Sequence, residues 1–182
     1  MMRLEAIIRS DPDLMRLLEQ LREMALPQGR VVSGCLYQTV WNVLTNRPRG
    51  TGILDYDVIY FDAGDLSWAA EDLVIRRVTG PLQFRNQARV HLWYEPHFGV
   101  PYAPLGSADE ALTRYPVTVQ AVGARLENDG RLDIIAPFGV DDLFAMVMRP
   151  NPACPHRPTF DAKVARARLI WPEISVIDRN DE

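Results

Sequence analysis

The sequence predicts an α/β (α+β) domain in which helices flank a mixed sheet, with a hairpin toward the C-terminus and an irregular tail beyond it. Three observations support this fold class. Leucine and methionine recur at helical spacing over residues 11–24. Residues 53–61 form an apolar run rich in strand-forming residues. Asn128-Asp129-Gly130 separates two further apolar runs, which is a common hairpin signal.

The first half of the chain predicts two helices before the first long strand. Ser10 is a suitable N-cap for the first helix, and Pro27-Gln28-Gly29 ends it. The predicted elements are, in chain order, a helix over 11–24, an apolar stub at 31–32, a helix over 35–44, a loop over 46–52, a strand over 53–61 and a helix over 67–78.

The second half predicts a second strand, a short helix, the hairpin and a last helix. These elements span residues 87–95, 107–114, 117–126 with 131–136, and 140–148. Because the helix over 67–78 is a crossover between two strands, we expect 53–61 and 87–95 to pair in parallel. After Arg149 the prolines become frequent, and Trp171 is the predicted anchor of the tail.

Length, charge and cysteine content restrict the class of protein. The 182 residues fit a single domain over 1–182, with a core over about 10–148 and an irregular tail over 149–182. A net charge of −4 and an isoelectric point near 5.4 argue against a general nucleic-acid binder. Two distant cysteines, no apolar leader and no membrane-spanning run predict a cytoplasmic protein with no membrane partner. The oligomeric state stays open.

Asp55 and Asp57 are the strongest candidates for chemistry. They lie two residues apart on a predicted strand, so their carboxylates project from one face. Two like charges in an apolar segment repel each other and lose hydration, and a divalent cation relieves both costs. Oxygen ligands favour Mg²⁺ or Mn²⁺. The alternative is that this end of the strand is exposed and both carboxylates are solvated.

A turn at Ser33-Gly34 precedes the predicted helix over 35–44. Free backbone N–H groups and the helix dipole at such a position favour an anion, and the serine hydroxyl adds a donor. By itself this pattern is more often a helix cap. Followed by the Asp55-Tyr56-Asp57 strand, it predicts a triphosphate held between a donor turn and a metal pair, as nucleotidyl or phosphoryl transfer requires.

The turn, the helix with Trp41-Asn42 and Asp55-Tyr56-Asp57-Val58 together resemble the signature of the nucleotidyltransferase-fold (polymerase-beta-like) superfamily. More closely, the chain is similar to a bacterial nucleotidyltransferase-like family, a resemblance that does not by itself name a reaction. The stretches that carry it lie at 57–62, 86–94, 136–144 and 149–151. Two features depart from the superfamily pattern: the turn reads Ser-Gly, and its spacing to Asp55 is longer.

The resemblance implies an NTP substrate, a divalent metal on Asp55 and Asp57, phosphate contacts from Ser33 and Gly34, and a third acidic residue on a neighbouring strand. Parallel pairing places Arg89 or His91 beside Asp57, which makes His91 a candidate catalytic base and Arg89 a candidate nucleotide contact. Antiparallel pairing would instead favour Glu95. Each of these residues is also compatible with a structural role.

Arg47 and Arg49 lie in the loop that absorbs the extra spacing, and they are candidate triphosphate contacts. Solvated loop arginines are the alternative.

The favoured function is metal-dependent transfer of a nucleotidyl group from an NTP to an acceptor that the sequence does not identify. Two alternatives remain: a degenerate member that binds nucleotide without turnover, and a structural protein with a vestigial pocket. A metal between Asp55 and Asp57 separates the structural reading from the other two, and turnover of labelled NTP separates those.

Overall fold

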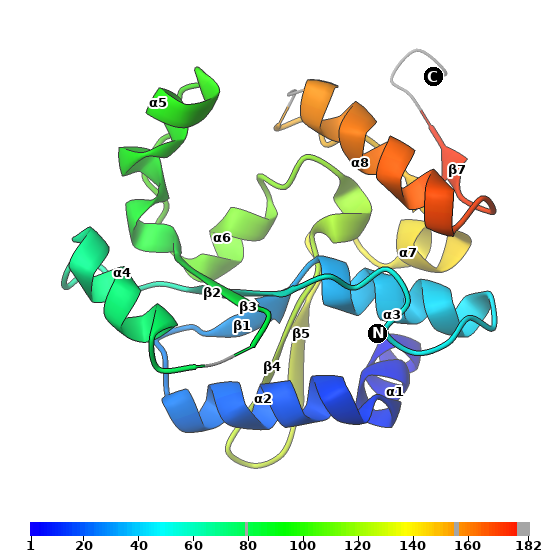
Figure 1. Ribbon diagram of the computed structural model, residues 1–182, viewed down its shortest axis with the longest axis horizontal. Helices are drawn as coiled ribbons and strands as arrows, with labels where there is room; N and C mark the ends of the chain where they lie inside the picture. The colour runs from blue at the N-terminus through cyan, green and yellow to red at the C-terminus, as the bar shows by residue number, and fades with distance from the viewer. Residues whose placement is uncertain (79, 155–156, 178–182) are drawn as a thin grey trace.

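The computed structural model describes residues 1–78, 80–154 and 157–177 (Figure 1). Its centre is a five-stranded mixed sheet of order β3-β2-β1-β4-β5. The strands are β1 (Arg30–Val32), β2 (Tyr56–Tyr60), β3 (Leu82–Asn86), β4 (Gly123–Leu126) and β5 (Leu132–Ile135). The strand β1 is antiparallel to β2 and β4, β2 is parallel to β3, and β4 and β5 form the predicted hairpin.

Helices flank this sheet, which confirms the predicted fold class. In Figure 1, α2 runs below the sheet, and α5, α6 and α8 lie above it. The helices are α1 (Met2–Ser10), α2 (Pro12–Met24), α3 (Gly34–Leu44), α4 (Trp68–Ile75), α5 (Tyr94–Phe98), α6 (Ala108–Leu112), α7 (Asp141–Ala145) and α8 (Arg157–Ile170). Two 3₁₀ helices, η1 (Gln87–Leu92) and η2 (Thr118–Gln120), and a small parallel pair, β6 (Val147–Met148) and β7 (Ser175–Val176), complete the described elements.

The N-cap of α2 is Asp11, one residue after the predicted Ser10. The Asp11 carboxylate accepts hydrogen bonds from the backbone N–H groups of Asp13 and Leu14. The Ser10 hydroxyl instead donates to the carbonyl of Ile7. The reason is that residues 2–10 already form α1, so Ser10 is the last residue of that helix.

The prediction of a strand over residues 87–95 is wrong, because these residues form η1 and the start of α5. The strand that pairs with β2 is β3, which begins directly after Gly80-Pro81, and the pairing is parallel as predicted. The side chain of Asn86 accepts a hydrogen bond from the N–H of Ala88 and turns the chain into η1. The residue of β3 that pairs with Asp57 is therefore Gln83.

The tail predicted to be irregular contains a helix of 14 residues, α8. Phe160, Val164 and Ala167 form its buried stripe. Trp171 follows the helix and is the anchor that the sequence predicted, since its indole N–H donates to the Asn42 side chain on α3 at 3.2 Å. Trp171 also packs edge-on against Trp41 at 5.4 Å between ring centroids.

The core therefore joins the sheet, α3 and the C-terminal region. Trp41 is fully buried, and its indole N–H donates to the carbonyl of Leu143 in α7 at 3.0 Å. Within the described ranges, no helix has both the length and the apolar character needed to cross a membrane.

Candidate functional site

Antiparallel pairing of β1 with β2 brings the predicted turn to the predicted acids. Val32 lies opposite Asp57, so Ser33, the next residue, lies beside the acidic end of β2. Gly34 begins α3, one residue before the predicted start of this helix, and the Ser33-Gly34 turn lies at its N-terminus as the sequence predicted. Residues 33–34 and 55–57 are far apart in the sequence, and the register of β1 against β2 brings them side by side.

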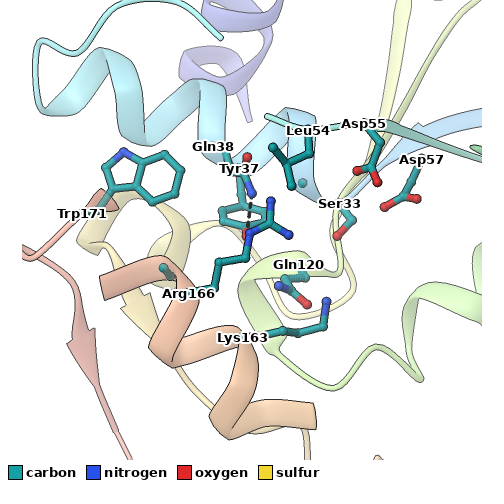
Figure 2. A pocket seen from close by; sticks show the side chains of 12 residues that line it. Ser33, Tyr37, Gln38, Leu54, Asp55, Asp57, Gln120, Lys163, Arg166 and Trp171 are labelled. Atoms are coloured by element: carbon teal, nitrogen blue, oxygen red, sulfur yellow. Dashed lines mark hydrogen bonds between the residues drawn. The ribbon is translucent and has the colours of Figure 1, made fainter. Parts of the chain in front are cut away.

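These residues line one cavity of about 70 Å³ between α3 and α8 (Figure 2). The carboxylates of Asp55 and Asp57 point toward it from one side, and the side chains of Lys163 and Arg166 reach toward it from α8. The described lining residues are Ser33, Gly34, Tyr37, Gln38, Leu54, Asp55, Asp57, Gln120, Lys163, Arg166, Ala167 and Trp171.

Ser33 has an unusual backbone conformation, with φ 60° and ψ −118°. This region is strained for any residue with a β-carbon, and such strain is concentrated at functional sites. The Ser33 hydroxyl makes no capping hydrogen bond to α3, which leaves it available to a ligand. At the turn before α3, a serine thus has a backbone conformation that is normally favoured only for glycine.

The two carboxylates differ in environment. Burial, and then the charge of Asp55, raise the pKa of Asp57, whereas the nearby positive charges of Lys163 and Arg85 oppose this shift. Asp55 accepts a hydrogen bond at 2.6 Å from the side-chain amide of Gln83 on β3. A cation between the two acids would offset both the burial of Asp57 and its repulsion by Asp55, which together raise its pKa.

Lys163 faces the acid pair from α8 without forming an ion pair with it in the described parts of the chain. Burial lowers the pKa of Lys163, and the charges of Asp57 and Asp55 oppose this shift. Arg166, one turn further along α8, donates only to the carbonyl of Gly52, at 3.2 Å, among the contacts described. Two cations and two carboxylates therefore converge on one cavity.

Two buried amides complete the lining. Gln38 and Gln120 are 7% and 3% exposed, and the side-chain oxygen of each has no hydrogen-bond partner among the described residues. A buried acceptor without a donor costs about 1–3 kcal/mol.

The donor set fits a magnesium-type ion that also binds a substrate. Among the residues that the structure describes, no group of three or more acidic, histidine or cysteine side chains could hold a metal. Mg²⁺ in proteins is commonly held by one or two carboxylates, with phosphates and water as the remaining ligands. Asp55 and Asp57 supply two such carboxylates beside a site that suits phosphate.

The other predicted site residues lie elsewhere. His91 and Glu95 are in η1 and α5, not in a strand beside Asp57, and neither lines the cavity. Arg89 forms a buried ion pair with Glu71 at 2.6 Å and also donates to the carbonyl of Leu66. The expectation that Arg89 or His91 lies beside Asp57 is wrong, because the strand on which it depended ends at Asn86.

The loop arginines are also engaged away from the cavity. Arg47 makes a bidentate contact with Glu173, at 2.8 and 3.1 Å. Arg49 lies 3.6 Å from Asp13. Neither arginine lines the cavity, and their contacts instead fix the loop to the C-terminal region and to α2.

Sequence reasoning missed Lys163, Arg166 and Gln120. The first two were overlooked because residues 149–182 were expected to be irregular. A signal for α8 was present: Phe160, Val164, Ala167 and Trp171 recur at helical spacing and place Lys163 and Arg166 on one adjoining side. The sequence offers no comparable signal for Gln120.

The fold is that of the nucleotidyltransferases. A family model described as Nucleotidyltransferase matches residues 19–176. The chain belongs to this nucleotidyltransferase family. A search of curated protein sequences finds no match to the chain.

Solved structures share the fold. The chain is similar to a protein whose NMR structure reveals a CCA-adding enzyme head domain, with a TM-score of 0.80, 24% identity and coverage of 96% of this chain and 94% of that one. It is also similar to the Thermotoga maritima CCA-adding enzyme complexed with tRNA, with a TM-score of 0.57, 17% identity and coverage of 98% and 43%. A CCA-adding enzyme in complex with CTP gives a TM-score of 0.54, 18% identity and coverage of 97% and 44%. The chain thus spans less than half the length of these two enzymes, and at these identities the likeness concerns the fold.

Proposed function

We propose that this protein transfers a nucleotidyl group from an NTP, bound with Mg²⁺ or Mn²⁺, to a hydroxyl-bearing acceptor. The observation that carries the proposal is the convergence of Asp55, Asp57, the N-terminus of α3 and two α8 cations on one cavity. Family membership supports the same reaction class. The CTP and ATP complexes of CCA-adding enzymes with this fold support an NTP as substrate.

In the transfer, an acceptor oxygen forms a bond to the α-phosphorus, the bond from that phosphorus to the bridging oxygen breaks, and pyrophosphate leaves with the bond's electron pair. The acceptor proton passes to water or to a carboxylate. A bound divalent ion would supply charge neutralisation for the phosphates. Asp55 and Asp57 would hold that ion.

The cationic end of the cavity suits the leaving pyrophosphate. The N–H groups at the start of α3 and the Ser33 hydroxyl would donate to phosphate oxygens, and Lys163 and Arg166 would balance the charge that develops as pyrophosphate leaves. Such groups act through positioning and charge, which carry most of the catalysis in this kind of transfer.

Labelled nucleotides test the reaction. The protein is incubated with Mg²⁺ or Mn²⁺ and a small-molecule cell extract as the acceptor source, and with each NTP labelled at either the α- or the γ-phosphate. Nucleotidyl transfer moves the α label into a new product and leaves the γ label in pyrophosphate, whereas transfer of the γ label into the product would contradict the proposal. The Asp57→Asn variant is the control for contaminating activity.

The second candidate function is that of a degenerate family member, which binds nucleotide without turning it over. Binding of NTP without transfer would support it. The specific observation that favours this candidate is the absence of a third acidic ligand among the described residues. Thermal denaturation with and without NTP and metal measures binding separately from transfer, since a ligand at 100 times its Kd adds roughly 2.7 kcal/mol of stability.

A cytoplasmic location stays a prediction.

A further inference from the structure

A second cavity, of about 300 Å³, adjoins the acidic site. Ser33, Asp57, Gln120 and Lys163 line both cavities, so the two meet at Asp57. The acidic cavity is about 70 Å³, which is well below the roughly 300–1,000 Å³ of pockets that enclose small-molecule ligands. Phosphate groups suit the smaller cavity, and the rest of an NTP needs the space beside it.

Four aromatic side chains form a wall of the larger cavity: Trp93, Tyr94, Phe98 and Tyr102. Tyr94 is central to this cluster, with ring centroids 4.7 Å from Phe98, 4.4 Å from Tyr102 and 6.0 Å from Trp93. Three of the four belong to the segment from the end of η1 through α5, which lies above the sheet on the same side as α8 (Figure 1). Phe98 remains 42% exposed, so the cluster is not fully enclosed by the protein.

The polar atoms of this cavity also suit a nucleoside. Gln120 lines both cavities, and its side-chain oxygen is a buried acceptor without a partner in the described chain. A ribose hydroxyl could donate to it. The guanidinium group of Arg114 lies 4.8 Å above the Tyr102 ring and is held by Glu110, which stiffens that part of the wall.

We propose that this aromatic cavity binds the nucleoside of the NTP, with the base stacked on the cluster of Trp93, Tyr94, Phe98 and Tyr102. The proposal rests on the proposed function, because it assumes that the triphosphate occupies the acidic cavity. The nucleoside is covalently joined to the α-phosphate, so it must enter a space that opens onto Asp57, and this cavity does. Stacking on aromatic side chains tolerates different bases because every base has a π-face.

Binding of nucleotide and of inorganic tripolyphosphate, each with Mg²⁺, tests the proposal by isothermal titration calorimetry. Tripolyphosphate reports the phosphate site alone, whereas ATP, GTP, CTP and UTP report both sites. We expect the wild-type protein to bind at least one NTP about 10-fold more tightly than tripolyphosphate, as one stacked base would provide.

The matched variants are Phe98→Leu in the cavity and Phe138→Leu outside it, since these two phenylalanines are 42% and 41% exposed. We expect Phe98→Leu and Trp93→Leu to weaken NTP binding about 10-fold and to leave tripolyphosphate binding unchanged. Phe138→Leu should change neither. Circular dichroism checks the fold, and the wild-type comparison of NTP with tripolyphosphate stands even if a variant fails to fold.

Three results would overturn the nucleoside pocket: equal wild-type affinity for NTP and tripolyphosphate, unchanged NTP affinity in both cavity variants, or equal losses for both ligands. Tripolyphosphate binding without any gain from the nucleoside would overturn this inference while leaving the proposed function standing. Binding of neither ligand to the wild-type protein would overturn both.

Discussion

Ser33 has a backbone conformation that serine rarely adopts, at the position where β1 turns into α3. Its amide is fixed by a hydrogen bond to the carbonyl of Val122, and its carbonyl accepts from Leu36 and Tyr37. The strain is therefore maintained by the central sheet and by the first turn of α3. A serine stands here where glycine would be less strained, and this is why we assign its hydroxyl a role in binding phosphate.

We expect Ser33→Gly to raise the free energy of unfolding by about 1 kcal/mol, because glycine adopts this conformation without the β-carbon clash. The same change should weaken binding of NTP with Mg²⁺ about 10-fold through loss of a charged hydrogen bond. Urea denaturation and calorimetry measure the two effects. Ser33→Ala is the control, since it keeps the strain and removes the hydroxyl: its stability should stay near that of the wild type, and its binding should match that of Ser33→Gly.

Asp57→Asn should abolish metal-dependent NTP binding while leaving the metal-free protein as stable as the wild type or slightly more so. The physical reason is that burial and the Asp55 charge raise the pKa of Asp57, so its ionised form is disfavoured in the fold. Melting temperatures with EDTA and metal-dependent NTP shifts give the comparison. An unchanged NTP shift in the variant would rule out the metal site.

The pH dependence of stability has a definite sign. Because the folded-state pKa of Asp57 is raised, the folded protein binds this proton more tightly than the unfolded chain does. The metal-free wild type should therefore gain stability relative to Asp57→Asn as pH falls from neutrality through the folded-state pKa toward the ordinary aspartate value. Urea denaturation of both proteins across acidic pH, in EDTA, measures the difference. A constant difference would contradict the assigned shift.

At the scale of elements, α8 changes the interpretation of the site. The Asp pair and the α3 turn lie on one side of the cavity, and α8 supplies the cations on the other (Figure 2). The helix is held by its buried stripe and by Trp171. In a chain with a net charge of −4, α8 thereby sets two cations against the two carboxylates of this cavity.

Lys163→Met should lower the affinity for Mg²⁺-bound tripolyphosphate and NTP by a similar factor of about 10, because a phosphate loses a charged donor. Arg168→Met is the matched control on an exposed part of α8. Equal affinities in the wild type and Lys163→Met would contradict the phosphate role.

Lys163 is the only lysine in the sequence, so reductive ¹³C-methylation labels no side-chain amine but its own, and the N-terminal amine gives the one other signal. Burial lowers the pKa of Lys163, so we expect its NMR titration midpoint to lie below that of a methylated free lysine, and to rise when tripolyphosphate binds. A midpoint at the free value would show that the amine is solvated.

At the scale of the whole molecule, the loop before β2 connects the site to the C-terminal region. Gly52, with φ +79°, lies against the Trp171 ring, and its carbonyl accepts from Arg166. A β-carbon at Gly52 would lie 2.5 Å from the Trp171 ring. The loop, α3 and α8 thus pack on one another around two tryptophans, Trp41 and Trp171.

Gly52→Ala should destabilise the protein by about 1–3 kcal/mol more than Gly50→Ala does. Both glycines have φ +79°, so both changes carry the same conformational cost, but nothing lies within 4 Å of a β-carbon at Gly50. Urea denaturation of the two variants measures the difference. Equal destabilisation would show that Trp171 moves aside without cost.

Local sequence was sufficient for much of the fold and for the centre of the site. Periodicity predicted α2, the local sequence also predicted helices at α3 and α4, and turn residues predicted the β4–β5 hairpin. Asp55-Tyr56-Asp57 and Ser33-Gly34 were identified from residue type and order. These features are local, because helix periodicity, turn chemistry and the alternation of side chains along a strand depend on neighbouring residues.

Contacts between distant segments decided the rest. The end of η1 that carries His91 resembles a strand in its pattern, but the cap by Asn86 and the pairing of β3 with β2 ended the strand before it. Arg89 forms an ion pair with buried Glu71 and does not line the acidic cavity, whereas Lys163 lines it because α8 packs beside it. A charged side chain is bound by whichever opposite charge the packed chain places within reach, and that distance is set by tertiary packing rather than by position along the sequence.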